Sequence, residues 1–199
     1  THTECIGHIT EDRVAINDVL RGGLHTARLI TVRPQRCGET EEDHEPAADP
    51  NDWIITGAAI AESLAQFPGH SDALILRTLP NGTDKLTHRY EGPAPAAYLS
   101  AQAAQTLVDA GILHIVTDLP SLDRSHDNGR LVAHRTFWGL DSPSRRSSDA
   151  RRGGATVTEL AWVAPTIRDG WYLLDLQVPA FVSDAAPSRP LLYPLRDHD

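Results

Sequence analysis

Hydrophobic and polar positions follow two different periods in the first half of the chain, and each period predicts a type of element. Residues 24–32 alternate well enough to form a strand, and residues 73–76 form a compact apolar run typical of a buried strand. Between them, residues 56–67 carry apolar side chains at helical spacing and end at a Pro-Gly pair. Residues 37–52 are acidic and contain prolines, so we expect an exposed loop there.

The second half of the chain again combines a helix with strands. Residues 100–109 begin with a serine that can cap a helix, and residues 112–117 form the next predicted strand. Residues 157–163 and 171–178 have the pattern of two strands joined by a turn that ends at Gly170. This order predicts one α/β domain over the whole chain, with α+β as the alternative.

Composition and charge narrow the class of protein. The chain has 199 residues, of which 40% are apolar and 23% charged, as in a globular domain with a real core. Its net charge of −9 argues against a nucleic-acid partner, and its one basic cluster, within residues 141–154, is better explained as a solvated loop than as a binding patch. No apolar run is long enough to span a membrane. Two cysteines, Cys5 and Cys37, suit a reducing compartment, so we expect a cytoplasmic protein, although a periplasmic one remains compatible.

The first eight residues hold two imidazoles and a carboxylate: His2, Glu4 and His8. Imidazole and carboxylate together suit zinc, manganese or iron. Taken alone, this spacing is a weak signal, and a solvated polar terminus is the commoner explanation. Cys5 lies among these residues and could also bind a metal, but a small buried side chain is the favoured interpretation.

A second group of candidates, His134 and Glu159, lies far downstream. Period two along the predicted strand places Glu159 in the same apolar-facing row as Val157. A carboxylate in such a row needs a partner, and a metal ion is a suitable one. For His134 the alternative is a histidine on the surface of a helix.

Four short runs accompany these two groups of candidates along the chain: Tyr98-Leu99-Ser100, Gly111-Ile112, Thr117-Asp118-Leu119-Pro120-Ser121-Leu122-Asp123 and Ala133-His134-Arg135. Together with the N-terminal group, they resemble one family of metal-dependent hydrolases, the cyclase or kynurenine formamidase-like family. Its N-terminal signature is His-x-Gly-Thr-His-x-Asp-x-Pro-x-His, and Thr1, His2, Glu4 and His8 fall on the second half of that signature in register. The resemblance extends over nearly the whole chain.

Two departures from the signature affect the expected site. Glu4 replaces the aspartate and Ile6 replaces the proline, so the carboxylate reaches one methylene further. The first histidine of the signature would precede Thr1. We therefore expect the sequence to be truncated at its N-terminus and any metal site to be short of one ligand.

The resemblance implies a fold and a set of residue roles. It implies a β/β/α swivelling-type domain and a homo-oligomer, a dimer or larger. It implies that one or two divalent ions, zinc or manganese, are bound per chain by His2 and Glu4 and by His134 and Glu159. Glu4 would bridge two ions, and His8 would act as the general acid and base.

Asp118, Ser121 and Asp123 follow the strand predicted over residues 112–117. Residues after a strand of an α/β fold often contact ligands, so we expect these three to bind substrate. The same residue types also build turns, and the sequence leaves both interpretations open.

The candidate ligands predict a metal-dependent enzyme, and the resemblance implies a hydrolase that cleaves a carbon–nitrogen bond in a small aromatic or cyclic substrate. Arylformamidase-like hydrolysis of N-formylkynurenine is the first expectation, and a lactone- or isatin-type ring hydrolase is an alternative. A member of the same fold that binds a small molecule without catalysis is the alternative from a different class. In each case the expected partner is a small molecule rather than a nucleic acid or a membrane.

Overall fold

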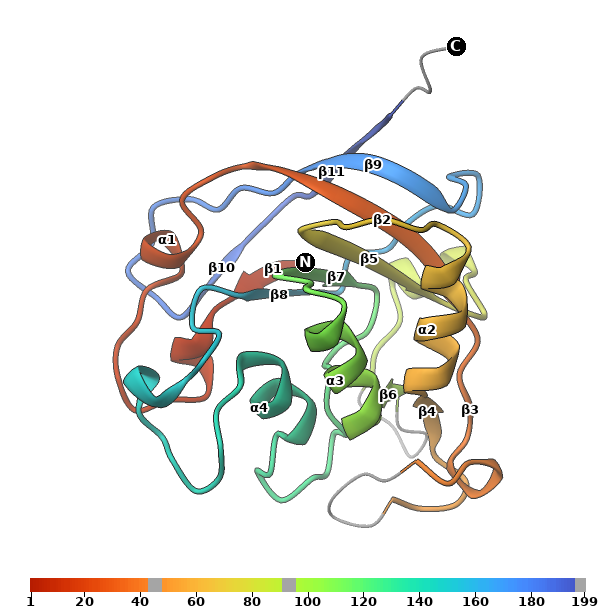
Figure 1. The fold of residues 1–199 in the computed structure, drawn as a ribbon, viewed down its shortest axis with the longest axis horizontal. Coiled ribbons are helices and arrows are strands. Elements are labelled where there is room, and N and C mark those ends of the chain that lie inside the picture. Colours follow the sequence, from red (N-terminus) through yellow and green to blue (C-terminus); the bar gives the residue numbers. More distant parts are fainter. Residues whose placement is uncertain (43–47, 91–95, 196–199) are drawn as a thin grey trace.

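The computed structural model describes residues 1–42, 48–90 and 96–195. Within these residues, eight strands form one large sheet in the order β10-β1-β8-β7-β5-β2-β9-β11. Figure 1 shows this sheet with helices α2, α3 and α4 beneath it. The strands are β1 (His2–Glu4), β2 (Leu24–Val32), β5 (Ala73–Thr78), β7 (His114–Thr117), β8 (Thr156–Glu159), β9 (Gly170–Asp175), β10 (Ala185–Pro187) and β11 (Leu191–Pro194).

Helices and a small second sheet complete the described fold. The α-helices are α1 (Ile16–Val19), α2 (Gly57–Ala65), α3 (Ala101–Asp109) and α4 (Val132–Trp138). The second sheet has the order β3-β4-β6, with bounds Gln35–Arg36, Trp53–Ile55 and Tyr98–Leu99. Single 3-10 turns lie at Ile6–His8, Cys37–Glu39, Thr83–Leu86 and Ser147–Asp149. None of the helices in the described ranges is long and apolar enough to cross a membrane.

The two longer helices begin where the sequence predicts them to begin. Thr56 caps α2 by accepting a hydrogen bond from the backbone N–H of Ala59, and Ser100 caps α3 by accepting one from Ala103. Each cap satisfies a backbone donor that has no partner inside the helix. The large sheet with helices packed against it also confirms the α/β class predicted from the order of elements.

The central strands run parallel, and this places one set of strand ends together. Strands β2, β5, β7 and β8 are mutually parallel, so their C-terminal ends lie along one edge of the sheet. Strand β1 runs antiparallel to β8, and His2 pairs with Glu159. The start of β1 therefore lies at the same edge as the ends of the parallel strands, where ligands bind in many α/β proteins.

The expectation of a strand pair over residues 157–163 and 171–178 is wrong. Strand β8 ends at Glu159, because Leu160 adopts a left-handed backbone conformation with φ of 55°. Strand β9 lies on the other side of β2, separated from β8 by three strands. Both edges of β8 are occupied by β1 and β7, so no edge remains for β9.

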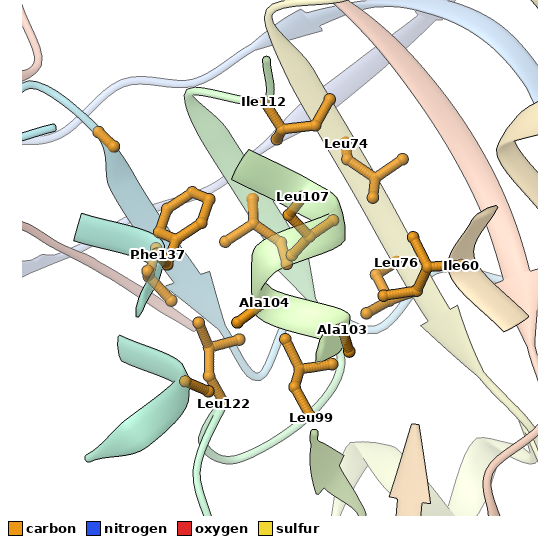
Figure 2. Close-up of a cluster of buried hydrophobic side chains, with 14 of the residues drawn as sticks. Ile60, Leu74, Leu76, Leu99, Ala103, Ala104, Leu107, Ile112, Leu122 and Phe137 are labelled. Atoms are coloured by element: carbon orange, nitrogen blue, oxygen red, sulfur yellow. The ribbon is translucent and has the colours of Figure 1, made fainter. Parts of the chain in front are cut away.

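Apolar side chains cover the sheet on both faces. On the helical face, α3 packs between α2 and α4, and Figure 2 shows Leu107 of this helix between Phe137 and Leu74. On the opposite face, Ile16 of α1 packs with Leu29 and Ile75 of the sheet. Burial on both faces explains why all six residues of β5 are buried and why its sequence does not alternate.

The packing around α3 generates a stability prediction. Leu107 is fully buried, so Leu107→Ala should lower the free energy of unfolding by about 3 kcal/mol through lost burial and a residual cavity. Leu113 is 43% exposed, so the matched change Leu113→Ala should cost less than about 0.5 kcal/mol. Urea unfolding followed by circular dichroism measures both. Equal losses for the two variants would contradict this description of the core.

Candidate metal centre and active site

Five predicted side chains meet at the C-terminal edge of the parallel strands. His2 and Glu4 come from β1, His8 from the following turn, His134 from α4 and Glu159 from the end of β8. The Nε2 atom of His134 lies 2.9 Å from Oε1 of Glu4, and the Nε2 atom of His8 lies 3.5 Å from Oε2 of the same carboxylate. These residues are up to 157 positions apart in the sequence, from His2 to Glu159.

Each carboxylate of this cluster is shared between His2 and His134. Oε2 of Glu4 lies 3.7 Å from His2 Nε2, while its Oε1 faces His134. Oε2 of Glu159 lies 3.6 Å from His2 Nε2, and its Oε1 lies 3.5 Å from His134 Nε2. The two carboxylates thus each direct one oxygen towards His2 and the other towards His134.

Strand pairing explains why these side chains converge. Strand β1 lies between β8 and β10, and its register sets His2 opposite Glu159 and Glu4 opposite Val157. Because side chains alternate along a strand, His2 and Glu4 point to one face, while Thr3 points to the other and hydrogen-bonds to Thr158. Alternation along β1, together with its register on β8, places both ligand candidates beside Glu159.

The conformation at the end of β8 keeps Glu159 in place. A non-glycine residue in the left-handed region costs of order 1–3 kcal/mol, and Leu160 adopts this conformation. Two hydrogen bonds hold it: its N–H donates to the carbonyl of Leu119, and its carbonyl accepts from Oγ1 of Thr1. The backbone N–H of Leu122 also donates to Oε1 of Glu159 over 3.0 Å.

Burial and the neighbouring charges shift the pKa values of the cluster. Burial by itself would raise the pKa of Glu4, but hydrogen bonds with His134 and His2 lower it to about 2. Burial raises the pKa of Glu159; the hydrogen bond with His134 opposes this, and the charge of Glu4 adds to it. Burial would lower the pKa of His134, but contacts with Asp123, Glu159 and Glu4 raise it well above its usual value. Two acidic groups this close therefore depend on positive charge beside them.

Asp123 is placed behind His134. Its Oδ2 lies 2.6 Å from Nδ1 of His134 and also accepts the backbone N–H of the same residue. Its Oδ1 accepts the backbone N–H of Ala133, so one carboxylate holds both the start of α4 and the imidazole ring. A carboxylate behind a histidine that faces a metal site is a common arrangement, because it fixes the ring and its tautomer.

The other two candidates for substrate binding occupy different surroundings. Asp118 accepts hydrogen bonds from the backbone N–H and hydroxyl of Thr78 and from the ammonium group of Lys85. The hydroxyl of Ser121 accepts the backbone N–H of Asp123, which is turn chemistry. The structure does not gather Asp118, Ser121 and Asp123 around one point, and their contact with substrate stays a prediction.

Asp118 lines a cavity of about 380 Å³ beside the cluster. Trp53, Tyr90 and Leu119 contribute apolar wall, and Lys85 and Arg33 contribute charge. The side chains of the His-Glu cluster do not line this cavity. Leu119 connects the two regions, because its carbonyl accepts the N–H of Leu160, next to Glu159.

Two features of the site carried no distinctive signal in the sequence. Asp184 lies 176 positions from His8, yet its Oδ2 is 2.9 Å from Nδ1 of that ring. The bond between Asp123 and His134 likewise depends on the three-dimensional path of the turn before α4.

Cys5 is buried, and its thiol donates a weak hydrogen bond to the carbonyl of Val14. Burial raises the pKa of Cys5 to about 11, so its thiol stays protonated near neutral pH.

The donor set fits a divalent cation. His2, Glu4 and Glu159 each offer one ligand atom, and these atoms all lie within 4.8 Å of one another. Nitrogen from imidazole together with carboxylate oxygen suits zinc and manganese. A cation would also offset the repulsion between two buried carboxylates, which the histidines offset only while they carry a proton.

Solved structures share the fold of the chain. One is described as a potential metal-dependent hydrolase with cyclase activity; it has 17% sequence identity and a TM-score of 0.62, and the match covers 96% of this chain and 76% of that one. Isatin hydrolase A from Labrenzia aggregata, bound to benzyl benzoate, has 15% identity and a TM-score of 0.59, with 96% and 71% covered. An isatin hydrolase bound to the product analogue thioisatinate has 17% identity and a TM-score of 0.55, with 98% and 71% covered.

At these identities the likeness to solved structures shows a common fold. A comparison with curated proteins gives no match. The sequence model of the Cyclase family matches residues 1–124, which include His2, Glu4, His8 and Asp123. This match spans more than half of the chain, and the chain therefore belongs to the Cyclase family.

Proposed function

We propose that the protein is a metal-dependent hydrolase that cleaves a carbon–nitrogen bond in a small cyclic or aromatic amide. The observation that carries the proposal is the pair of buried carboxylates, Glu4 and Glu159, which three imidazoles surround. Such a pair is costly to bury unless a cation lies between its members. The fold that the chain shares with metal-dependent hydrolases supports the same conclusion.

Four side chains would hold the metal. His2 and His134 each face one oxygen of Glu4 and one oxygen of Glu159. This arrangement offers ligands for one or two ions of zinc or manganese, with both carboxylates able to bridge. His134 has to lose its proton to become a ligand, so binding at this histidine would release a proton.

His8 is placed for proton transfer. When bound, a divalent cation would polarise the substrate carbonyl and acidify the water that attacks it. His8 is 44% exposed at its side chain, while its Nε2 faces the carboxylate of Glu4. It can therefore accept a proton from the attacking water and return it to the leaving nitrogen.

The shared fold and the aromatic lining of the neighbouring cavity both favour a cyclic or aromatic substrate. Three of the structures that share the fold are isatin hydrolases, which supports a cyclic amide as substrate. An open-chain formamide such as N-formylkynurenine uses the same chemistry and is the second candidate. Trp53 and Tyr90 in the cavity beside the cluster suit a planar ring.

Metal content tests the role of Glu4. Glu4→Asp keeps the charge and shortens the reach, so it should retain metal, whereas Glu4→Gln removes the charge and should lose at least half of it. Glu11→Gln is the matched control, because Glu11 is exposed and pairs with Arg145. Elemental analysis of the protein purified without chelator measures all three. Full metal content in Glu4→Gln would show that Glu4 is not a ligand.

The contact behind His134 generates a second prediction. Asp123→Asn leaves an oxygen facing the ring but removes the charge, so zinc affinity should fall by about 10- to 100-fold, as for other partners of metal ligands. Competition with a chromophoric chelator measures the affinity, and circular dichroism checks that α4 is retained. Asp141→Asn, which changes an exposed pair with Arg151, should leave the affinity unchanged. An unchanged affinity in Asp123→Asn would contradict the positioning role of Asp123.

Turnover separates the proposed enzyme from a binding protein. The metal-loaded protein should hydrolyse isatin or N-formylkynurenine. The change in absorbance on cleavage of the amide bond measures the rate for either compound. His8→Ala should lower kcat by at least about 100-fold and keep its metal, since general acid–base catalysis contributes about 10²–10⁴. His134→Ala should lose metal and activity together. Tight binding of either compound without turnover would favour the non-catalytic alternative.

A further inference from the structure

The imidazole of His8 has a second carboxylate neighbour that takes no part in the proposed metal cluster. Its Nδ1 lies 2.9 Å from Oδ2 of Asp184, while its Nε2 faces Glu4. The other oxygen of Asp184, Oδ1, accepts a hydrogen bond from the hydroxyl of Ser183. Since a carboxylate only accepts hydrogen bonds when it is ionised, the contact with Asp184 requires a proton on Nδ1 of His8.

The backbone fixes Asp184 in this position. Its carbonyl accepts the backbone N–H of Cys5 over 3.0 Å, and the following residue, Ala185, begins β10 opposite Glu4. The carbonyl of Ser183 accepts the N–H of Ile16 in the same way. Asp184 is therefore attached to the strand that carries the metal ligand candidates, on the side opposite β8.

The glycine before His8 makes the close approach of Asp184 to this turn possible. A Cβ atom on Gly7 would lie 2.3 Å from the carbonyl oxygen of Val14 and 3.3 Å from Cβ of Asp184. The first distance is a clash with backbone, so any side chain at this position would displace the turn. The contact between His8 and Asp184 thus depends on close packing of the turn at Gly7 against the segments around Val14 and Asp184.

We propose that Asp184 is a positioning residue that holds His8 in the tautomer with its proton on Nδ1, so that Nε2 presents its lone pair to the reacting groups. The groups that face the His8 ring are Asp184, Glu4 and, with ring centroids 6.2 Å apart, His134. This inference rests on the proposed function, because it assigns the tautomer needed for His8 to act as a base. Which ring nitrogen carries the proton is set by the hydrogen bond that the other nitrogen makes.

The proton transfers balance within this arrangement. The water oxygen forms a bond to the carbonyl carbon as one of its protons moves to Nε2 of His8. The carbon–nitrogen bond then breaks, and the same proton moves from Nε2 to the departing nitrogen. Between these steps the ring is a cation, and the carboxylate of Asp184 stabilises that cation and prevents the ring from turning.

Nuclear magnetic resonance tests the tautomer without any substrate. Long-range ¹H–¹⁵N spectra of the zinc-loaded protein, at a pH where the imidazole is neutral, should show His8 with Nδ1 protonated; the signal is assigned by its absence in His8→Gln. In Asp184→Ala the ring should shift towards the Nε2-protonated form, and Asp184→Asn should keep the original tautomer because an acceptor oxygen remains. A His8 ring protonated on Nε2 in the unmodified protein would overturn the proposal.

Kinetics on whichever amide is hydrolysed provide the second readout. Asp184→Ala should lower kcat by at least about tenfold with KM changed less than about twofold, and Asp184→Asn should fall between this variant and the unmodified protein. In a His8→Ala background, Asp184→Ala should have no further effect, because Asp184 acts only through His8. Metal content should be unchanged, and Asp141→Asn serves as the control for an exposed aspartate.

The two readouts separate the possible failures. If no amide is hydrolysed but the tautomer depends on Asp184, the proposed function fails and the positioning role stands. If turnover occurs and Asp184→Ala alters kcat less than about twofold, or alters it equally in the His8→Ala background, the positioning role is refuted while the hydrolase stands.

Discussion

The burial of two carboxylates beside each other is the constraint on which the rest of this structure depends. Glu4 and Glu159 are 1% and 4% exposed and share the same two histidine neighbours. Removing a charge from water costs several kcal/mol, and a like charge nearby adds to that cost. Positive charge must therefore accompany the pair, either as protons on His2 and His134 or as a bound cation. This requirement is the physical basis of the metal-dependent hydrolysis proposed above.

The architecture supplies this cluster through strand register rather than through a local motif. The parallel strands bring their C-terminal ends to one edge, and β1 inserts next to β8 in the opposite direction. His2 and Glu4 then face Glu159, and α4 adds His134 from the helical face. Asp123 and Asp184 support two of the imidazoles from outside the cluster. The core around α3 is what keeps α4 against the sheet.

The sequence predicts those elements whose bounds are determined locally, by hydrophobic periodicity and by helix caps. Strand β2 has the predicted bounds, and α2 and α3 start at the predicted caps because each cap satisfies helix donors directly. The burial of Glu159 followed from period two and its row with Val157. The shorter strands, such as β1 and β10, have too few residues to show a period, and they form only because the sheet provides partners. The end of β8 depends on the backbone conformation of Leu160, and the contact of Asp184 with His8 spans nearly the whole chain, so neither could be predicted from local pattern.

Anomalous diffraction at the zinc edge, from crystals grown with zinc, shows whether a cation accompanies the two buried carboxylates. We expect an anomalous peak between Glu4 and Glu159, with carboxylate oxygens at about 2.0–2.2 Å and His2 or His134 completing the ligands. We also expect His134 to turn from its hydrogen bond with Glu4 to the metal while it keeps its bond to Asp123. Crystals grown with zinc that show no peak at this position, and in which His134 is still bonded to Glu4, would contradict a metal site at these carboxylates.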